Sequence, residues 1–344
     1  MKVAISQSAL SSASRTRGVG AYTRELIEAL QRVYPGDKYS AVQGDPYQED
    51  VDIVHFPFFD PFFLTLPLYQ SKPTVVTIHD AIPLKYPKHF PVGIKGSLKW
   101  QLQRLAARRT SHIITDSHAS KKDIIHVFGV EADQVIVVPL APATDRGTVV
   151  IEDKVKKEYN LPVRYLLYVG DINWNKNIPG LIRMFDELKS SNTHLVLVGK
   201  VFSDKPQIPE YLRIQSAISA STHHELIHTV GYVPSHHLST IYRLATLYVQ
   251  PSFDEGFGLP ILEAMKEHCP IAASTRGSLK EVGGTAVAYF DPDKPQEMVR
   301  VVKELLGSKA KRDHLGELGA KRVKQFSWDK TARLTRDVYE KILG

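Results

Sequence analysis

Short apolar segments recur along the whole chain, and each is followed by a turn and then by an amphipathic helical pattern. Nearly continuous apolar runs are typical of strands in parallel sheets that are covered on both faces. At 20–30, for example, Tyr22, Leu26 and Leu30 share one face of a predicted helix. The predicted strands lie at 2–6, 52–56, 74–80, 112–117 and 135–140, and then at 165–171, 194–200, 228–233, 245–252, 270–275 and 286–291. This alternation predicts an α/β protein with doubly wound parallel sheets.

The strand series is interrupted once, by a polar segment at 141–162. Because 344 residues also exceed the usual size of one domain, we predict two Rossmann-like domains, at 1–155 and 156–325. Doubly wound sheets bind their ligands beyond the carboxyl ends of the strands. The residues that carry function are therefore expected in the loops that follow strands.

The segment PSFDEGFGLPILEA at 251–264 joins a predicted strand to a predicted helix and shows the strongest pattern. Gly256 and Gly258 allow the backbone to approach a ligand closely. Glu255 precedes them on the loop, and Glu263 is expected in the first turn of the helix, where the macrodipole favours a carboxylate. Both carboxylates are therefore expected to bind one ligand. The alternative is a capped helix with two incidental acids.

A second loop, after the strand at 165–171, contains the sequence GDINWNKN. Gly170 ends the strand, Asp171 follows it, and Lys176 and Asn177 come just before a predicted helix. A lysine in such a loop can neutralise a diphosphate as its charge grows during bond cleavage. The alternative is a lysine that is only solvent-exposed.

In the first half, a glycine turn comes after the first strand. Gly18 and Gly20 lie just before or at the start of the helix predicted at 20–30, whose free amides suit a phosphate or a sugar hydroxyl. The dinucleotide-binding fingerprint needs a third glycine where this chain has Thr23, so nicotinamide binding is disfavoured. A simple tight turn is the alternative.

Histidines also lie near the ends of two strands in the first half. His79 and Asp80 end the strand at 74–80, and a histidine there can bond a substrate hydroxyl or phosphate near neutral pH. His55 is a second candidate of the same kind. For both histidines the alternative is a structural role at a strand end.

The net charge of +7 is unevenly distributed, because lysines and arginines cluster between Lys95 and Lys122, with Asp116 as the only acid before Asp123. Such a patch suits anionic lipid, a diphosphate ligand or nucleic acid, and a solvated helix face is the alternative. Nucleic-acid binding would need aromatic side chains that stack on bases, and the segment contains only Trp100. Anionic lipid is therefore preferred over nucleic acid as a partner.

The composition, with 43% hydrophobic and 24% charged residues, is that of a soluble globular protein rather than a disordered chain. A single cysteine, Cys269, forms neither an internal disulfide nor a cysteine metal cluster, and it fits a reducing compartment. The most apolar segment, at 53–69, is interrupted by Asp60 and prolines and is a poor membrane span. We therefore expect a cytoplasmic protein, with peripheral binding at the inner face of the cell membrane through the basic segment.

Two aspartate pairs have the spacing of a metal-binding motif, Asp50 with Asp52 and Asp291 with Asp293. We interpret the first pair as the start of a strand. We interpret the second as the start of a helix, with Asp293 as N-cap and Gln296 completing a capping box. Neither pair has further oxygen ligands beside it in the sequence, so no metal is predicted.

Taken together, these motifs resemble those of the family-4 glycosyltransferases, which are retaining enzymes with the GT-B fold of two facing Rossmann-like domains. The matching segments are GVGAYTREL, TIHDAIPLKYP, TDSHASKKDI, YVGDINWNKN and PSFDEGFGLPILEAM, and the last is similar to the family's signature of two glutamates separated by seven residues. The resemblance implies an acceptor-binding first domain and a nucleotide-sugar-binding second domain. It extends to FSWDKTARLTRDVYEKIL and implies that a helix in 326–344 crosses back to the first domain.

The resemblance implies a role for each matching position, with His79, Lys176 and Glu255 as the catalytic set. Glu255 is expected to bind hydroxyls of the donor sugar near C3 and C4, and Glu263 the ribose of the nucleotide. Lys176 is expected to stabilise the diphosphate, and His79 to contact the C6 hydroxyl of the sugar or the acceptor. The other donor-binding residues are expected to be Gly18, Gly20, Gly170, Asp171, Asn177, Gly256, Phe257, Gly258 and Leu259.

The resemblance further implies transfer with retention, in which the donor phosphate takes the acceptor proton and no carboxylate acts as nucleophile. Asp80 is expected beside the acceptor, and no metal or cofactor is implied. One position departs from the family's pattern, because the arginine that often joins the lysine on the diphosphate is replaced here by Asp171. Either Arg15, Arg17 or Lys200 supplies the second cation, or diphosphate binding is weaker.

Similarity to the mannosyl-transferring members favours GDP-mannose as donor, with a glycan or lipid-linked acceptor in cell-surface polysaccharide synthesis. UDP-glucose and UDP-N-acetylglucosamine remain alternative donors. A phosphorylase or an epimerase is an alternative within the same fold, although no segment for a pyridoxal-phosphate lysine is recognisable. The alternative of another class is a non-catalytic basic module that binds glycan or nucleic acid.

Overall fold

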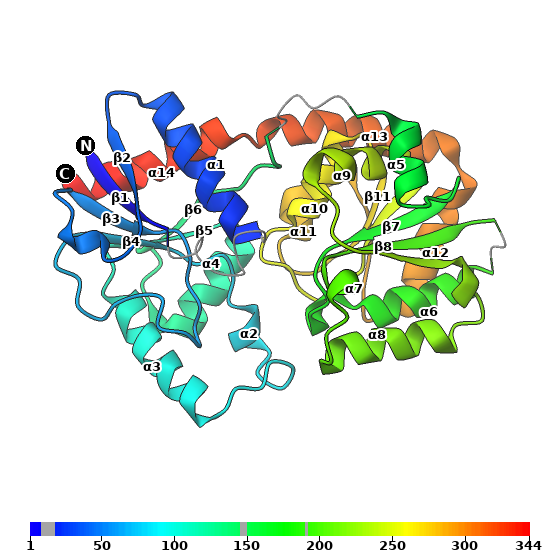
Figure 1. Ribbon diagram of the computed structural model, residues 1–344, viewed down its shortest axis with the longest axis horizontal. Coiled ribbons are helices and arrows are strands. Elements are labelled where there is room, and N and C mark those ends of the chain that lie inside the picture. Colours follow the sequence, from blue (N-terminus) through cyan, green and yellow to red (C-terminus); the bar gives the residue numbers. More distant parts are fainter. Residues whose placement is uncertain (8–17, 145–149, 190–191) are drawn as a thin grey trace. The chain divides into compact units, whose positions relative to one another are not determined.

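Figure 1 shows the computed structural model, in which the chain forms two compact units. The structure describes residues 1–7, 18–144, 150–189 and 192–344. The first unit comprises Met1–Ala141 and Phe326–Gly344, and the second comprises Pro142–Gln325. Each unit contains one six-stranded parallel sheet with helices around it, which confirms the predicted α/β architecture.

The C-terminal helix α14 (Trp328–Leu343) belongs to the first unit, where it packs against α1 (Gly18–Val33). Thr331 Oγ1 in α14 donates a hydrogen bond of 2.7 Å to the carbonyl of Pro139. The division after residue 325 coincides with the expected start of the C-terminal segment. The other division falls after Ala141, earlier than the boundary predicted at 155, so that α5 (Glu152–Glu158) belongs to the second unit.

The first sheet has the strand order β2–β1–β3–β4–β5–β6, and every neighbouring pair is parallel. Its strands are β1 (Lys2–Ser6), β2 (Lys38–Val42), β3 (Ile53–Phe56), β4 (Thr74–Thr77), β5 (His112–Thr115) and β6 (Val135–Val137). Besides α1 and α14, its helical elements are η3 (Pro46–Gln48), α2 (Ile82–Lys85), α3 (Ile94–Arg108), α4 (His118–Ile124) and the π-helical turn η4 (Ile125–Gly129). The hydrophobic pattern did not predict β2, because only Tyr39 and Val42 of this edge strand are buried and the strand contains Lys38 and Ser40.

The second sheet has the order β12–β11–β10–β7–β8–β9 and is also parallel throughout. Its strands are β7 (Tyr165–Val169), β8 (His194–Val198), β9 (Ile227–Val230), β10 (Leu247–Gln250), β11 (Ile271–Ser274) and β12 (Ala288–Phe290). Helices α6 (Ile178–Leu188), α8 (Pro209–Ala220) and α12 (Pro295–Gly307) pack together on one side, and α9 (Ser235–Leu244), α10 (Leu259–Lys266) and α13 (Lys309–Arg322) on the other. The shorter helical elements are η5 (Trp174–Lys176), α7 (Val201–Asp204), η6 (His224–Leu226), α11 (Leu279–Gly283), η7 (Gly284–Ala286) and η8 (Val323–Gln325).

The strands that precede the candidate loops are fully embedded in their cores. All five residues of β7 and all four of β10 are buried. Leu181 and Phe185 of α6 pack in the same core cluster as Leu166 of β7, and each large apolar side chain of this kind stabilises the fold by roughly 1.5–3 kcal/mol. The strand ends are therefore fixed points from which loops present polar side chains. In the described ranges, none of the helices combines the length and the apolar character that crossing a bilayer requires.

The start of α12 differs from the predicted capping box. Lys294 occupies the N-cap position, and no side chain caps the helix. Asp293 instead forms an ion pair with Arg276, and its backbone N–H donates to Asp291 Oδ1 at 3.2 Å. The prediction of Asp293 as N-cap with Gln296 is wrong, because the aspartates form a turn before the helix. Across the described parts of the chain, no three histidine, cysteine, aspartate or glutamate side chains gather as they would around a metal ion.

Candidate active site

The two strongest candidate loops follow neighbouring strands at the centre of the second sheet. β7 lies between β10 and β8, and the chain proceeds from β7 to one edge of the sheet and from β10 to the other. In a doubly wound sheet this reversal is the topological switch point, where the loops diverge and leave room for a ligand. The loop with Lys176 follows β7 and the loop with Glu255 follows β10, so the topology brings both to one place.

Lys176 and Glu255 form a direct ion pair at this point. The Nζ atom of Lys176 lies 2.9 Å from Oε1 and 2.8 Å from Oε2 of Glu255. The side chain of Lys176 is 20% exposed and that of Glu255 is 7% exposed. Such a pair is screened less by solvent than a surface ion pair, because little water reaches it. The sequence predicted both residues for the site but did not predict that they contact each other.

The Glu255 carboxylate also accepts hydrogen bonds from residues of its own segment. Gln250 Nε2 donates to Oε1 at 2.6 Å, and Ser252 Oγ donates to the same oxygen at 2.7 Å. Gln250 and Ser252 are themselves buried and bonded to each other at 2.8 Å. The carboxylate is thereby held in a single orientation. Sequence analysis missed Gln250 and Ser252, although both lie within five residues of Glu255.

The loops after β7 and β10 are bonded to each other through backbone and side-chain groups. The side-chain amide of Asn175 donates to the carbonyl of Asp254 at 2.9 Å, and the N–H of Phe253 donates to the carbonyl of Asn175 at 2.7 Å. The rings of Trp174 and Phe253 stack with their centroids 5.1 Å apart. Asn177, which was predicted to bind the donor, has a left-handed backbone with φ of 54° and donates from its amide to a loop carbonyl. These contacts fix the distance between the Lys176 and Glu255 backbones.

A third loop, between β11 and α11, contacts the backbone of the loop that contains Glu255. The single hydroxyl proton of Ser278 has two carbonyl oxygens within hydrogen-bond distance of Oγ, that of Phe257 at 2.7 Å and that of Glu255 at 3.0 Å. Gly277 has a positive φ of 58°, and a Cβ at this position would lie 2.5 Å from the carbonyl oxygen and 2.6 Å from the amide nitrogen of Glu255. Only glycine therefore allows this approach. Neither Gly277 nor Ser278 was predicted as part of the site, because their contact with the loop is made across the sheet.

We expect Gly277→Ala to lower the unfolding free energy of the protein by about 1–3 kcal/mol, from the left-handed backbone alone. The displaced Glu255 backbone is expected to lower turnover by about tenfold or more. Gly307→Ala is the matched control, since a Cβ there meets nothing within 4 Å. Thermal unfolding and turnover of the two variants test this prediction, and equal behaviour would show that the β11–α11 loop does not position Glu255.

The glycine-rich part of the loop leads into α10. Gly258 has a φ of 98° and occupies the N-cap position of α10, and an added Cβ would lie 2.8 Å from Leu279. Phe257 is buried, and Gly256 precedes it in the same turn. Leu259 is the first residue of the helix. The predicted glycine turn is therefore present, and it orients the start of α10.

Glu263 lies in the second turn of α10, so the prediction that it lies in the first turn is wrong. The helix begins at Leu259, and its first turn contains no acid. Tyr242 in α9 donates its hydroxyl to Glu263 Oε2 at 3.0 Å. Burial raises the pKa of the Glu263 carboxyl, an effect that the hydrogen bond from Tyr242 and the charge of Lys266 oppose. The orientation of Glu263 thus comes from Tyr242 rather than from the helix macrodipole.

Asp171 shapes the end of β7. Its Oδ1 accepts a hydrogen bond of 2.9 Å from the backbone N–H of Ile172, and its carbonyl accepts one of 2.6 Å from the Tyr168 hydroxyl. Gly170, with a φ of 156°, approaches Gly199 so closely that a Cβ on Gly199 would lie 2.4 Å from the Gly170 carbonyl. This contact is made between the ends of the neighbouring strands β7 and β8.

Of the three cations that were considered as a replacement for the missing arginine, Lys200 lies in the described residues. It follows β8, is exposed, and directly precedes α7, at the same edge of the sheet as Gly170. Arg15 and Arg17 lie outside the described residues.

In the first unit, His79 pairs with Asp116, a residue that was not predicted for the site. His79 Nδ1 donates to Asp116 Oδ2 at 2.8 Å, and the ring of Tyr22 meets the imidazole edge-on at 4.8 Å between centroids. Burial on its own lowers the pKa of His79, but the charge of Asp116 and its hydrogen bond outweigh that effect and raise the pKa above 6.5. Asp116 follows β5 as His79 follows β4, and these strands are neighbours. Asp116 could have been identified from the sequence, because it follows its strand much as His79 follows the preceding one.

The other first-unit candidates have local structural contacts. Asp80 Oδ1 accepts from the N–H of Ile82 at 2.9 Å, at the start of α2. Helix α1 includes both Gly18 and Gly20, and Gly20 is buried. His55 is fully buried, with Nδ1 2.7 Å from the Tyr339 hydroxyl and Nε2 2.8 Å from Thr77 Oγ1. These contacts favour the structural interpretation of His55 over a role in binding.

The burial of His55 predicts a dependence of stability on pH. Burial lowers the pKa of His55 to about 3, whereas in the unfolded chain its pKa is near 6.5. Between these values the unfolded state binds a proton that the native state does not, so stability falls as the pH is lowered, by at most about 1.4 kcal/mol per pH unit. Urea unfolding at several pH values from 6.5 downward is expected to show a steeper slope for the wild type than for His55→Gln. Parallel slopes would contradict this account.

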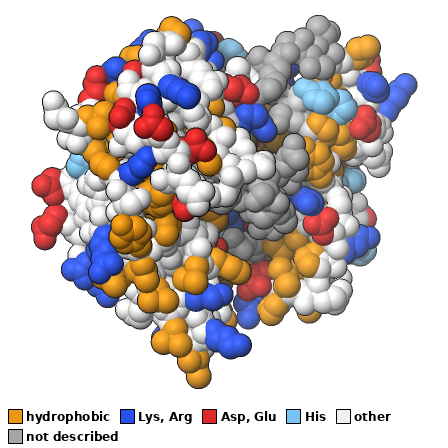
Figure 2. Space-filling view, turned by 60° about the vertical axis from the view of Figure 1, so that its left-hand side comes forward, with side chains coloured by type: hydrophobic (Ala, Val, Ile, Leu, Met, Phe, Trp, Pro, Cys, Tyr) orange, Lys and Arg blue, Asp and Glu red, His pale blue; other side chains and the backbone are white. Residues whose placement is uncertain are grey.

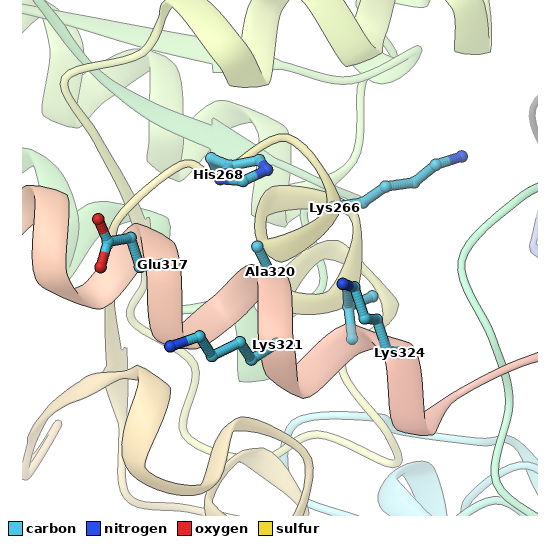
Figure 3. Close-up of a pocket in the computed structure, with 7 residues that line it drawn as sticks. Lys266, His268, Glu317, Ala320, Lys321 and Lys324 are labelled. Atoms are coloured by element: carbon cyan, nitrogen blue, oxygen red, sulfur yellow. The ribbon is translucent and has the colours of Figure 1, made fainter.

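A separate cavity of about 390 Å³ lies in the second unit between α10, the residue His268 and the helices α13 and η8 (Figure 3). Lys266, Lys321 and Lys324 line it with Glu317. The amino group of Lys266 extends away from the other side chains and donates to the carbonyl of Ala143 at 3.0 Å. Lys176 and Glu255 do not line this cavity, so it is distinct from the loops at the switch point.

Two doubly wound parallel sheets, with a paired lysine and glutamate at the switch point of the second, are the arrangement expected of a glycosyltransferase with the GT-B fold. The chain belongs to the family described as glycosyl transferases group 1, whose model matches residues 150–322. A second model, described as Glycosyltransferase Family 4, matches residues 47–146. The family that the motifs resembled is thereby confirmed.

Similar sequences include several mannosyltransferases. The chain is 28% identical over 324 residues to O-antigen chain mannosyltransferase B of Escherichia coli, covering 92% of this chain and 80% of that one. It is 30% identical over 249 residues to the MMP alpha-(1->4)-mannosyltransferase of Mycolicibacterium hassiacum, covering 71% and 57%. It is 29% identical over 278 residues to the serotype-specific mannosyltransferase WbdA of Escherichia coli, covering 78% of this chain but 34% of that protein.

Similar solved structures establish the fold along the whole chain. Sucrose-phosphate synthase from Thermosynechococcus elongatus superposes with a TM-score of 0.75 at 17% identity, covering 100% of this chain and 99% of that one. Anabaena HepE in complex with UDP superposes with a TM-score of 0.71 at 14% identity, covering 99% and 100%. At these identities the likeness concerns the fold alone.

Proposed function

We propose that this protein is a retaining mannosyltransferase that transfers mannose from GDP-mannose to a glycan or lipid-linked acceptor in cell-surface polysaccharide synthesis. The choice of mannose rests on the mannosyltransferases among its relatives. The proposal includes a cytoplasmic location at the inner face of the cell membrane. The observation that carries the proposal is the Lys176–Glu255 pair at the switch point of the second sheet.

In the proposed reaction, the donor displaces the direct contact between Lys176 and Glu255. Hydroxyls of the mannose near C3 and C4 donate to the Glu255 carboxylate, which Gln250 and Ser252 already hold in place. The ammonium group of Lys176 then pairs with the diphosphate. Glu263, oriented by Tyr242, binds the ribose. The buried pair thereby supplies a hydrogen-bond acceptor, Glu255, for the sugar hydroxyls and a cation, Lys176, for the leaving diphosphate.

The bond between the sugar C1 and the diphosphate oxygen breaks as the acceptor hydroxyl attacks C1 from the same face. The acceptor proton passes to the departing phosphate oxygen, so atoms and charges balance without a protein nucleophile. Lys176 stabilises the negative charge that develops on the diphosphate. His79, with its protonated form favoured by Asp116, is assigned to the C6 hydroxyl or to the acceptor.

A diphosphate brings more negative charge than one lysine neutralises. We propose that Lys200 supplies the second positive charge in place of the arginine that Asp171 replaces, because Lys200 follows the strand next to β7. With two lysines at the diphosphate, the reaction requires neither a metal ion nor a cofactor.

A panel of nucleotide sugars tests this proposal, with hydrolysis and nucleotide release measured in the absence of acceptor. GDP-mannose is expected to be turned over faster than UDP-glucose and UDP-N-acetylglucosamine. If a UDP-sugar is turned over faster, the protein is still assigned as a glycosyltransferase, but GDP-mannose is not its preferred donor. If none of the sugars is bound or hydrolysed, the non-catalytic binding module is the better description.

A further inference from the structure

Large apolar side chains are exposed along one face of α3 in the first unit. Ile94, Leu98, Leu102 and Leu105 are between 41% and 82% exposed. At 3.6 residues per turn these four positions fall within an arc of about 80°. The opposite face of the helix is buried through Gln103, Ala106 and Ala107. The exposed leucines are therefore not directed into the core of their own unit.

The segment after β3 extends the same apolar surface. Phe63 and Leu64 are 62% and 64% exposed, and the ammonium of Lys99 in α3 lies 5.2 Å from the Phe63 ring. The segment is fixed to α3 by the buried Gln103, which accepts from the N–H of Leu66 at 2.9 Å and donates to its carbonyl at 2.8 Å. We call Phe63, Leu64, Ile94, Leu98, Leu102 and Leu105 the apolar ridge.

Basic residues flank the apolar ridge along α3. The stretch from 81 to 115 contains seven lysines and arginines and no aspartate or glutamate, a surplus equal to the net charge of +7 of the whole chain. On the helical wheel Lys95 lies on one side of the apolar arc and Arg108 on the other. Figure 2 shows hydrophobic side chains beside lysines and arginines in the lower part of the view. An apolar strip between two basic margins is the pattern of a helix that lies in a lipid–water interface.

We propose that the apolar ridge docks this protein on an anionic lipid surface, with the ridge side chains in the headgroup–acyl boundary and the flanking basic groups on lipid phosphates and carboxylates. A second copy of the chain is a poorer occupant, because two such surfaces would bring like charges together. The docking surface differs in extent from the basic segment at 95–122. Lys122 lies beyond the buried strand β5, so the surface covers 63–109 rather than 95–122.

The test is sedimentation of the full chain with vesicles of phosphatidylcholine alone or of phosphatidylcholine with phosphatidylserine. We expect binding to the anionic vesicles, weaker binding to the neutral ones, and a decrease as salt is added. The double variant Ile94→Ser/Leu98→Ser is expected to bind the anionic vesicles about tenfold more weakly or worse. The control Ile151→Ser/Val163→Ser removes exposed apolar side chains from the second unit and is expected to bind like the wild type.

Equal binding by the ridge variant and the control variant would overturn the proposal, as would equal binding of the wild type to neutral and anionic vesicles. Light scattering without lipid provides a further arm, since a wild-type dimer that the ridge variant loses would assign the ridge to a second copy. The proposal does not depend on the identity of the donor. The ridge variant is expected to keep wild-type hydrolysis of the nucleotide sugar in lipid-free buffer, so a failure of lipid binding is distinguishable from a failure of the proposed function.

Discussion

Replacing Lys176 with methionine is expected to lower donor turnover by about 100-fold or more, the usual cost of removing a group that stabilises developing charge. The loss has two sources, because the diphosphate loses its cation and the buried Glu255 loses its ion-pair partner. Steady-state kinetics with GDP-mannose measures the effect. Lys154→Met, an exposed position on α5, is the matched control and is expected to change turnover little.

A double variant separates these two sources. In Lys176→Met/Glu255→Gln the amide no longer needs a cation, so the unfolding free energy lost in Lys176→Met is expected to return in part. Turnover is expected to stay low, because the leaving group still lacks its cation and the sugar hydroxyls have also lost the Glu255 carboxylate. An unfolding free energy that does not return in the double variant would show that the stability lost in Lys176→Met does not come from the unpaired Glu255. Near-normal turnover of Lys176→Met by itself would contradict the leaving-group role.

Glu255→Gln is expected to lower kcat/KM for the donor by about 100-fold while changing the affinity for free GDP by less than about threefold. The amide keeps the size of the carboxylate, but it loses the charge that makes the bonds to sugar hydroxyls strong. Calorimetric titration with GDP and kinetics with GDP-mannose provide the two readings.

Glu263→Gln is the comparison variant, because it is expected to change the affinity for GDP, which Glu255→Gln leaves nearly unchanged. Because Glu263 is assigned to the ribose, this variant is expected to weaken GDP binding and donor binding together. If Glu255→Gln and Glu263→Gln lose GDP affinity equally, the two acids do not serve different ends of the donor. If Glu255→Gln retains full donor use, the assignment of Glu255 to the sugar is wrong.

The parallel sheets could be predicted from sequence because buried strands in such sheets are almost wholly apolar. The edge strand β2 could not, since only two of its five residues are buried and Lys38 and Ser40 interrupt any apolar run. The capping box at Asp293 was predicted from local spacing alone. The ion pair with Arg276, which comes from a distant turn, is what redirected this aspartate.

The positions of the candidate residues Lys176 and Glu255 just after strands were predictable from the strand pattern and the motifs. Their contacts were not, because Lys176 and Glu255 meet only after β7 and β10 become neighbours in the sheet. Gly277 and Tyr242 were missed for the same reason, since each touches the Glu255–Glu263 segment from another loop or helix. Glu263 was misplaced by one turn although the helix start was expected at Leu259, because Glu263 is the fifth residue of the helix and so lies beyond its first turn.

Hydrogen exchange with and without GDP-mannose tests the central claim most directly, namely that the loops after β7 and β10 hold the donor. The account predicts that the nucleotide sugar slows amide exchange in 171–177 and 251–263, and that GDP alone protects the Glu263 end more than the Glu255 end. Exchange in the cavity residues near His268 is expected to stay unchanged. Donor binding that protects this cavity, and leaves 171–177 and 251–263 unaffected, would contradict the account.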